Sequence, residues 1–413
     1  MHLQFNVFDI RDDLERGKFC IKKFSQYLFS RGYKVNEEYG VCSRFYEQDF
    51  MEQVDRLSYQ KRNGEILGKL FGVPFSVSEN LLSIDSSYGY SDLLDVTILR
   101  RLFAEGALLL CSTKDSSWTR DDLILYSNEL EQEIIDTSEL CQASLAVRYG
   151  LTPVSLTLNS NYEWIFQTLH GGVFSFVPSR SLIPYTGLSL ERELATRLVF
   201  FARNLKDMCI FCEVCSGDDG RDENLSRSLT KKLLVGRNFL DIFKPRVLVI
   251  DEKLNSGESE DNNSGWILNR ITNNDFYSDR LDLSEFFDLD ELVLQCENEL
   301  VEQKKDLQKA STVSNRRGGG VFFETFFSDL LSTSDVIILK LDISSAINDI
   351  FEYKLTKLFY FFGFPIIGVP FRFTDQEAIK LMLFFVGHKD RDDKLMSVVD
   401  YSMRNLLLFK GDY

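Results

Sequence analysis

Short, unbroken apolar runs that alternate with helix-like stretches constrain the fold of this 413-residue chain more than any other feature. The runs ALLLC (107–111), PRVLVI (245–250) and DVIILKLD (335–342) have the length of strands and lack polar alternation. Such runs are typical of sheet strands that helices cover on both faces. Stretches with helical spacing lie between them, for example DVTILRRLFAEG (95–106) and FARNLKDMCIFCEVC (201–215). The pattern predicts an α/β fold with a central mixed, mostly parallel sheet covered by helices on both faces.

The ends and breaks of this pattern indicate how the chain is organised. An N-terminal helical segment is expected over about residues 8–62, with one amphipathic helix over 9–32 that ends at Gly32 and a second over 46–57. The stretch DEKLNSGESEDNNSG (251–265) is acidic and rich in Ser and Asn, without apolar spacing, which predicts a flexible insert. Because no internal repeat is visible, we expect one domain over residues 1–413.

The charge balance and the apolar runs exclude several classes of protein. With 63 acidic against 47 basic residues the net charge is −16, and such a surface repels phosphate backbones. We therefore expect no direct contact with nucleic acid. No apolar run reaches the roughly 18 residues that a membrane helix needs. Acidic residues such as Asp9, Asp12 and Asp13 near the start are unlike a signal or transit peptide, so the sequence predicts a soluble, cytoplasmic protein.

Eight cysteines without regular spacing predict reduced thiols. Cys209, Cys212 and Cys215 form C-x-x-C-x-x-C, which fits either an iron–sulfur or zinc site or one face of a buried helix. No fourth ligand follows nearby, and the surrounding apolar residues have helical spacing. The spacing favours core packing, and we expect no metal site and no cofactor.

Several motifs also occur in a recognisable order along the chain. They are LGKLFGVPFSVSEN (67–80), DVTILRRLFAEGALLLCST (95–113), ASLAVRYGLTPVSLTL (143–158), GGVFSFVPS (171–179) and FPIIGVPFRF (364–373). In order and spacing they resemble the amidase signature family, in particular its glutamyl-tRNA(Gln) amidotransferase A-subunit branch. The resemblance covers nearly the whole chain and implies the amidase-signature fold, with partners like the B and C subunits of an amidotransferase complex. It also admits a mitochondrial or plastid location, although no transit peptide is evident.

The family's chemistry, as the resemblance implies it, is a Ser-Ser-Lys triad. A lysine, acting through a bridging serine, activates a nucleophilic serine that attacks an amide carbonyl. In this chain Ser78 stands at the lysine position, Glu139 at the bridging position and Glu163 at the nucleophile position. None of the three residues is the type that the family uses. The resemblance therefore predicts a pseudo-amidase, a non-catalytic protein that acts as a scaffold or binding subunit.

The loops around these positions have also changed. Asn161 and Tyr162 replace the glycines that form the family's oxyanion hole, where glycine allows close backbone approach. Glu79 and Asn80 keep the polar character of the family's Asp-Asn pair, and we expect them to tie their loop through hydrogen bonds to backbone.

Alternative interpretations remain open at this point. One is a working enzyme, either an amidotransferase A subunit with a rebuilt site that hydrolyses glutamine to supply ammonia for Gln-tRNA formation, or an amidase with another nucleophile such as Ser160. Glu139 and Glu163 could also bind a cation or act as acid and base. We favour the interpretation that each glutamate pairs with a nearby Arg or Lys or reaches solvent, while Tyr162 and Trp164 fill the pocket. A small-molecule binder that uses the pocket without turnover is the third alternative.

Overall fold

A computed structural model gives the arrangement of the chain in space. It describes residues 6–82, 93, 95–115, 142–159, 162–188, 196–222, 225, 245–250, 277–281, 288–306, 318–342, 351–371 and 381–407. The expected insert over 251–265 lies outside the described residues. Across the part of the chain that is described, none of the helices is both long enough and apolar enough to cross a membrane.

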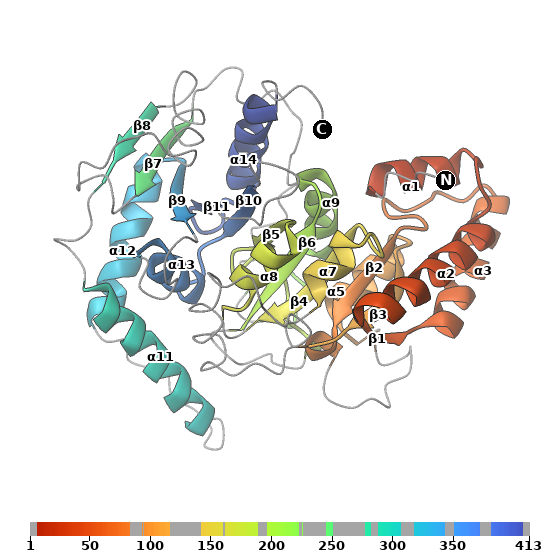
Figure 1. Ribbon diagram of the computed structural model, residues 1–413, viewed down its shortest axis with the longest axis horizontal. Coiled ribbons are helices and arrows are strands. Elements are labelled where there is room, and N and C mark those ends of the chain that lie inside the picture. Colours follow the sequence, from red (N-terminus) through yellow and green to blue (C-terminus); the bar gives the residue numbers. More distant parts are fainter. Residues whose placement is uncertain are drawn as a thin grey trace.

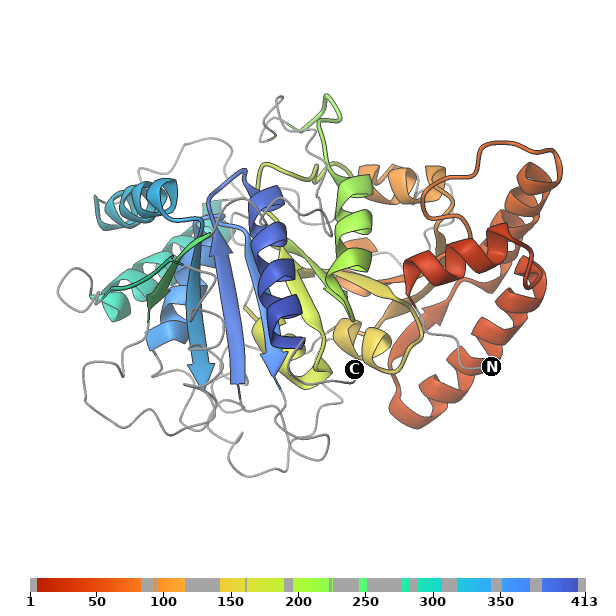
Figure 2. The ribbon, with the colours of Figure 1, turned by 90° about the horizontal axis from the view of Figure 1, so that it is seen from above.

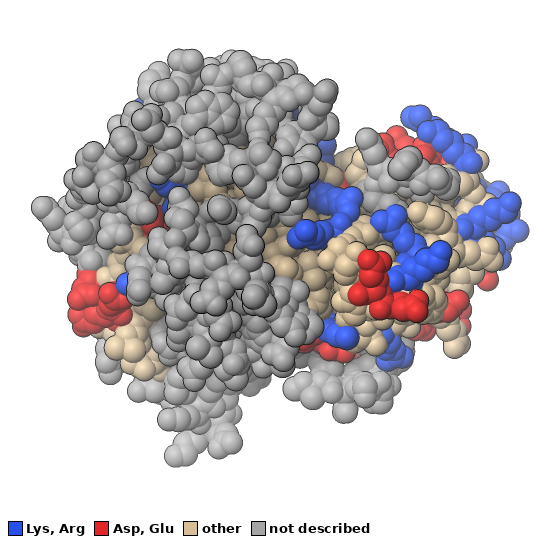
Figure 3. Space-filling model, in the orientation of Figure 1, with Lys and Arg blue, Asp and Glu red and all other residues tan. Residues whose placement is uncertain are grey.

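Residues 7–62 form an N-terminal lobe, at the right of Figure 1. Its elements are α1 (Val7–Glu15), α2 (Ile21–Tyr39), β1 (Cys42–Phe45) and α3 (Glu47–Arg62). Besides its three helices the lobe contains the strand β1, which was not expected. The expected bounds of the helical segment stay a prediction. Figure 3 shows acidic and basic side chains intermixed on its surface, and ion pairs such as Lys18–Asp13 and Lys22–Asp55 join opposite charges within it.

The single helix expected over 9–32 is wrong, because glycines at two positions have other roles. Gly17, with a φ of 72°, lies in the break between α1 and α2, in a conformation that residues with a Cβ rarely adopt. Gly32 does not end α2. A Cβ at this position would lie 2.8 Å from a ring carbon of Phe45, so the glycine permits close packing inside the helix. The helix continues to Tyr39 and ends at Gly40, which has a left-handed conformation.

The middle of the chain supplies the elements around Ser78 and Glu163. They are β2 (Pro74–Ser78), the 3-10 turn η1 (Glu79–Leu82), α5 (Thr97–Ala104), β3 (Leu108–Thr113), α7 (Ala143–Arg148), β4 (Val154–Asn159), α8 (Trp164–Gly171), β5 (Phe174–Val177), β6 (Arg197–Ala202) and α9 (Leu205–Cys215).

The C-terminal part adds the far end of the sheet and its helices. These elements are β7 (Arg246–Ile250), β8 (Tyr277–Arg280), α11 (Leu289–Asp306), α12 (Gly318–Thr333), β9 (Val336–Asp342), α13 (Phe351–Phe361), β10 (Ile366–Phe371), β11 (Leu381–Gly387) and α14 (Asp392–Leu407). The strand β11 lies inside the sheet, between β10 and β9.

The described strands form one 11-stranded sheet in the order β1-β3-β2-β4-β6-β5-β10-β11-β9-β7-β8. The α/β class and the mixed sheet are confirmed, but the expected excess of parallel pairs is wrong. Among these strands, β2–β3, β2–β4, β7–β8 and β7–β9 pair in parallel, and the other six neighbouring pairs are antiparallel. Continuous apolar runs report that both faces of a strand are covered, and they do not report its direction.

Helices cover both faces of the sheet, as predicted. Helices α5, α9 and α14 lie on one side, and α7, α8 and α13 lie on the other (Figure 2). Alternate residues of each strand therefore enter different cores. On β6, Leu198 and Phe200 join the core under α9, whereas Val199 and Phe201 join the core under α8. The expectation of a single domain stays a prediction.

Candidate functional site

Ser78 is the last residue of β2, a strand that is fully buried between the parallel neighbours β3 and β4. Its side chain is buried, and its hydroxyl donates a hydrogen bond to Oδ1 of Asn80. At the position where the resemblance leads us to expect the family's base, the side chain is therefore a hydroxyl whose proton already has an acceptor. A serine hydroxyl does not act as a general base near neutral pH.

Asn80 ties the loop after β2 to two neighbouring strands. Its amide nitrogen donates to the carbonyl of Leu158 at 2.6 Å and to Oδ1 of Asp115 at 3.0 Å. Its amide oxygen accepts from the backbone N–H of Leu158 at 3.3 Å, and Glu79 accepts from the backbone N–H of Asp115 at 3.4 Å. These bonds to backbone are the structural role expected for Glu79 and Asn80. They hold the loop in place without creating a base or a nucleophile.

Because β2 and β4 run in parallel, the C-terminal end of β4 lies at the same end of the sheet as Ser78. Tyr162 lies in the segment after β4 with a φ of 64°, a left-handed conformation that is uncommon outside glycine. Glu163 follows as the residue that precedes α8, and its side chain is buried. The other positions of interest, Glu139, Ser160 and Asn161, lie outside the described residues.

Aromatic side chains fill the space beside this segment. Tyr162 is 5% exposed and contacts the ring of Tyr360 edge-on, with 5.3 Å between the ring centroids. Trp164 is fully buried and stacks on Tyr360 at 6.0 Å. The Lys357 ammonium lies 5.1 Å from the centroid of the Tyr162 ring. Both rings are therefore buried in one aromatic cluster, and the expectation that they fill the family's pocket stays a prediction.

Tyr360 also connects this cluster to the neighbouring strands. Its hydroxyl donates to the carbonyl of Asn159, the last residue of β4, and burial raises its pKa. Arg197 places its guanidinium 5.1 Å from the Tyr360 ring and donates to the carbonyls of Tyr360, at 2.8 Å, and Pro178. Burial lowers the pKa of Arg197 to about 10. The groups in this cluster hold the fold together, and their donors point at backbone carbonyls.

Sequence reasoning missed Arg197 and Tyr360. Arg197 begins β6, a strand that lay partly inside the helix expected over 201–215. Tyr360 lies in α13, some 200 residues after Asn159, so no local motif joins them. The signal available in the sequence was an arginine at the start of the apolar run RLVFFA (197–202), which the structure shows to be a buried strand.

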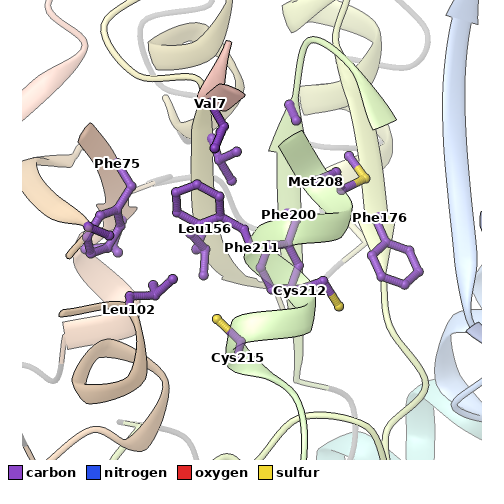
Figure 4. Close-up of a cluster of buried hydrophobic side chains, with 14 of the residues drawn as sticks. Val7, Phe75, Leu102, Leu156, Phe176, Phe200, Met208, Phe211, Cys212 and Cys215 are labelled. Atoms are coloured by element: carbon purple, nitrogen blue, oxygen red, sulfur yellow. The ribbon is translucent and has the colours of Figure 1, made fainter. Parts of the chain in front are cut away.

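Cys209, Cys212 and Cys215 lie on α9, and all three are buried in the core between α9 and the sheet. Figure 4 shows Cys212 and Cys215 on this helix with apolar side chains, such as Phe211 and Phe200, around them. Burial raises the pKa of each thiol, that of Cys215 to about 12, which disfavours the thiolate that binds metal. Within the described ranges no group of three or more His, Cys, Asp or Glu side chains could hold a metal ion. The burial supports core packing.

Comparison with known proteins agrees with the fold and with the motifs. No protein-family model matches the sequence. The A subunit of glutamyl-tRNA(Gln) amidotransferase from Protochlamydia amoebophila is 23% identical over 225 residues, which cover 51% of this chain and 46% of the relative. The corresponding protein from Chlamydia pneumoniae is 20% identical over 264 residues, 58% of this chain and 54% of the relative. The chain thus spans about half the length of the curated relatives it matches.

The similarity in structure extends further than the similarity in sequence. A bacterial aryl acylamidase of the amidase signature enzymes superposes with a TM-score of 0.71 and 12% identity, covering 97% of this chain and 96% of that chain. At this identity the likeness establishes the fold alone. This chain has the fold of the amidase signature enzymes, and its sequence resembles the A subunit of glutamyl-tRNA(Gln) amidotransferase.

Proposed function

We propose that this protein is a pseudo-amidase, an amidase-signature protein that does not hydrolyse amides and acts as a scaffold or binding subunit. The observation that carries the proposal is Ser78. It occupies the position at the end of β2 where the family resemblance places the lysine base, and its buried hydroxyl donates to Asn80. A nucleophilic serine needs a base within hydrogen-bond reach, and a hydroxyl in this place does not supply one.

The second support is the segment where the resemblance places the oxyanion-hole glycines. Tyr162 packs its ring on Tyr360 and is nearly buried. An oxyanion hole requires backbone N–H groups that face an open position where the substrate oxygen arrives. A buried aromatic side chain takes up room that this substrate would need.

The proposed role within a complex rests on the relatives. Those that match in sequence carry the name of the A component of glutamyl-tRNA(Gln) amidotransferase. We propose partners that resemble the B or C subunits of such a complex, bound by surfaces that the pseudo-amidase keeps after losing its chemistry. Purification of the tagged chain from its native cells tests this role. Recovery with such partners supports it, and recovery as a lone chain contradicts it.

A serine-reactive fluorophosphonate probe tests the loss of catalysis, together with a glutaminase assay on the purified chain and its co-purified partners. We expect no labelling and no ammonia above the background of a heat-denatured sample. A catalytically active amidotransferase, treated in parallel, controls for the probe. Labelling that disappears in a single Ser→Ala variant, with Ser160→Ala as the first to examine, would show a rebuilt enzyme instead.

A further inference from the structure

Cys42 and Cys111 bring two thiols together at one end of the sheet. Cys42 is the first residue of β1, the edge strand, and Cys111 lies in β3, the strand that pairs with it. Their sulfur atoms are 3.1 Å apart, although 69 residues separate them in the sequence. Both side chains are buried. A disulfide bond joins sulfurs at about 2.05 Å, so a movement of about 1 Å would close this pair.

We propose that Cys42 and Cys111 are a reversible dithiol site that is oxidised by low-molecular-weight disulfides of the glutathione type. The Cys42 thiolate attacks one sulfur of glutathione disulfide, which forms a mixed disulfide and expels one glutathione thiolate. The Cys111 sulfur then attacks the Cys42 sulfur, which closes the Cys42–Cys111 bond and expels the second glutathione. The protein loses two electrons and two protons, and the oxidant becomes two glutathione thiols.

The position of β1 explains how an oxidant reaches a buried pair. The strand has four residues, pairs only with β3 among the described strands, and exposes Ser43 and Arg44. Short edge strands open at a lower free energy than the interior strands of a sheet. Cys111 lies on the interior side of the pair, and its hydrogen bond with Cys42 and its burial raise its thiol pKa. Cys42 therefore meets the oxidant first, and Cys111 resolves the mixed disulfide.

The cysteines of α9 and Cys20 differ from this pair. The three thiols of α9 follow one another along a single helix face, and burial keeps them protonated. Cys20 is exposed at the start of α2, where backbone hydrogen bonds from Lys23 and Lys22 lower its pKa. We expect Cys20 to react early with glutathione disulfide and to form a glutathione adduct. The Cys20→Ser chain removes this side reaction and is therefore the starting material for the test.

The disulfide would link the N-terminal lobe to the sheet beside the candidate site. Cys111 lies two residues before Thr113, which pairs with Ser78 across β2 and β3. The bond would close a loop of about 70 residues and so reduce the freedom of the unfolded chain. We expect the melting temperature to rise by about 2–5 °C on oxidation and to return with dithiothreitol.

The test uses the full-length Cys20→Ser chain in glutathione buffers of increasing oxidised fraction. After alkylation of free thiols, non-reducing peptide mapping by mass spectrometry identifies the products. We expect a Cys42–Cys111 linked peptide and the loss of two alkylatable thiols per chain. The additional change Cys42→Ser should abolish both results, whereas Cys212→Ser, at a buried thiol elsewhere, should preserve them.

The proposal fails if the oxidised chain carries only glutathione adducts, links between other cysteines, or unchanged thiols. Mapping of the Cys20→Ser chain decides this even if one of the added variants does not fold. The readout involves no hydrolysis and no partner, so its result is independent of the proposed function.

Discussion

Tyr162 combines an unfavourable backbone conformation with buried aromatic packing. Its φ of 64° is a left-handed conformation that suits glycine better than a residue with a side chain. A non-glycine residue in this region costs roughly 1 kcal/mol. The compensation is visible in the packing, because the ring is buried against Tyr360. At this turn, buried aromatic packing offsets an unfavourable backbone conformation.

The substitution Tyr162→Gly tests whether the cost of the backbone conformation or the gain from burying the ring is larger. Glycine relieves the strain but removes a buried aromatic ring, whose truncation typically destabilises a protein by about 3–5 kcal/mol. We expect a net loss of roughly 2 kcal/mol in the free energy of unfolding, measured by urea denaturation. This glycine alone should not produce hydrolysis, because Ser78, a hydroxyl that donates to Asn80, stands where the resemblance expects the lysine base. A more stable Tyr162→Gly protein would show that strain outweighs packing at this turn.

At the scale of the elements, α9 is held at both ends by side chains. Asn204 caps its first turn by accepting from the backbone N–H of Asp207 at 2.8 Å. At the other end Arg101, from α5, donates to the carbonyls of Cys215, Ser216 and Gly217 at 2.8–2.9 Å. The guanidinium satisfies carbonyls that no intrahelical donor reaches and complements the helix dipole. The two helices are therefore fixed relative to each other.

The substitution Arg101→Lys tests this attachment. A lysine keeps the positive charge but lacks the planar fork that reaches several carbonyls at once. We expect the free energy of unfolding to fall by about 2 kcal/mol, since hydrogen bonds to charged groups contribute more than neutral ones. Arg100→Lys is the matched control, because Arg100 is the neighbouring residue on α5 and is exposed. It should change stability by less than about 0.5 kcal/mol. Equal effects of the two variants would rule out a special role for Arg101.

At the scale of the whole molecule, two buried aspartates join the helices α1 and α14 to the rest of the fold. Their protonation also makes the stability of the protein depend on pH. Asp207 accepts from the backbone N–H of Val7 at 3.0 Å, which joins α1 to α9, and Asp392 at the start of α14 accepts from Ser179 at 2.7 Å. Burial raises the pKa of Asp207 to about 7 and that of Asp392 to about 6. Burial and the nearby Arg148 lower the pKa of His170 to about 4.

These pKa shifts have opposite consequences for stability. Unfolded aspartates titrate near pH 3.9, so the unfolded chain releases their protons first. The stability that Asp207 contributes is present in full below about pH 4 and is lost as the pH rises to about 7. The His170 contribution is present in full above about pH 6.5 and is lost as the pH falls toward 4.

The variant Asp207→Asn removes the contribution of Asp207 to the pH dependence of stability, which is larger than that of Asp392. The amide keeps an oxygen that can accept from Val7, and it does not lose a proton. We expect the variant, compared with the wild-type chain, to gain about 2–3 kcal/mol in the free energy of unfolding between pH 5 and pH 8. Chemical denaturation at the two pH values measures this difference. The exposed Asp329→Asn should show no such change. A constant offset for Asp207→Asn would contradict the assigned pKa shift.

Local patterns in the sequence were sufficient for much of the fold. The unbroken runs around β3, β7 and β9 predicted buried strands, because burial on both faces removes polar residues from a strand. Motif order placed Ser78 at the end of β2 and predicted the bonds from Asn80 to backbone. It also predicted the amidase-signature fold.

Only the tertiary structure decided strand direction, the aromatic cluster and the thiol pair. Direction depends on which strands become neighbours, and the pattern of apolar residues is the same for a parallel and an antiparallel partner. Tyr360 meets Asn159 and Arg197 from another helix, and Cys42 meets Cys111 across 69 residues. Such contacts form when distant segments pack together, so no spacing along the chain encodes them. The sequence by itself determined which apolar runs become buried strands and which motifs resemble the amidase signature family. Packing determined which distant side chains meet around them.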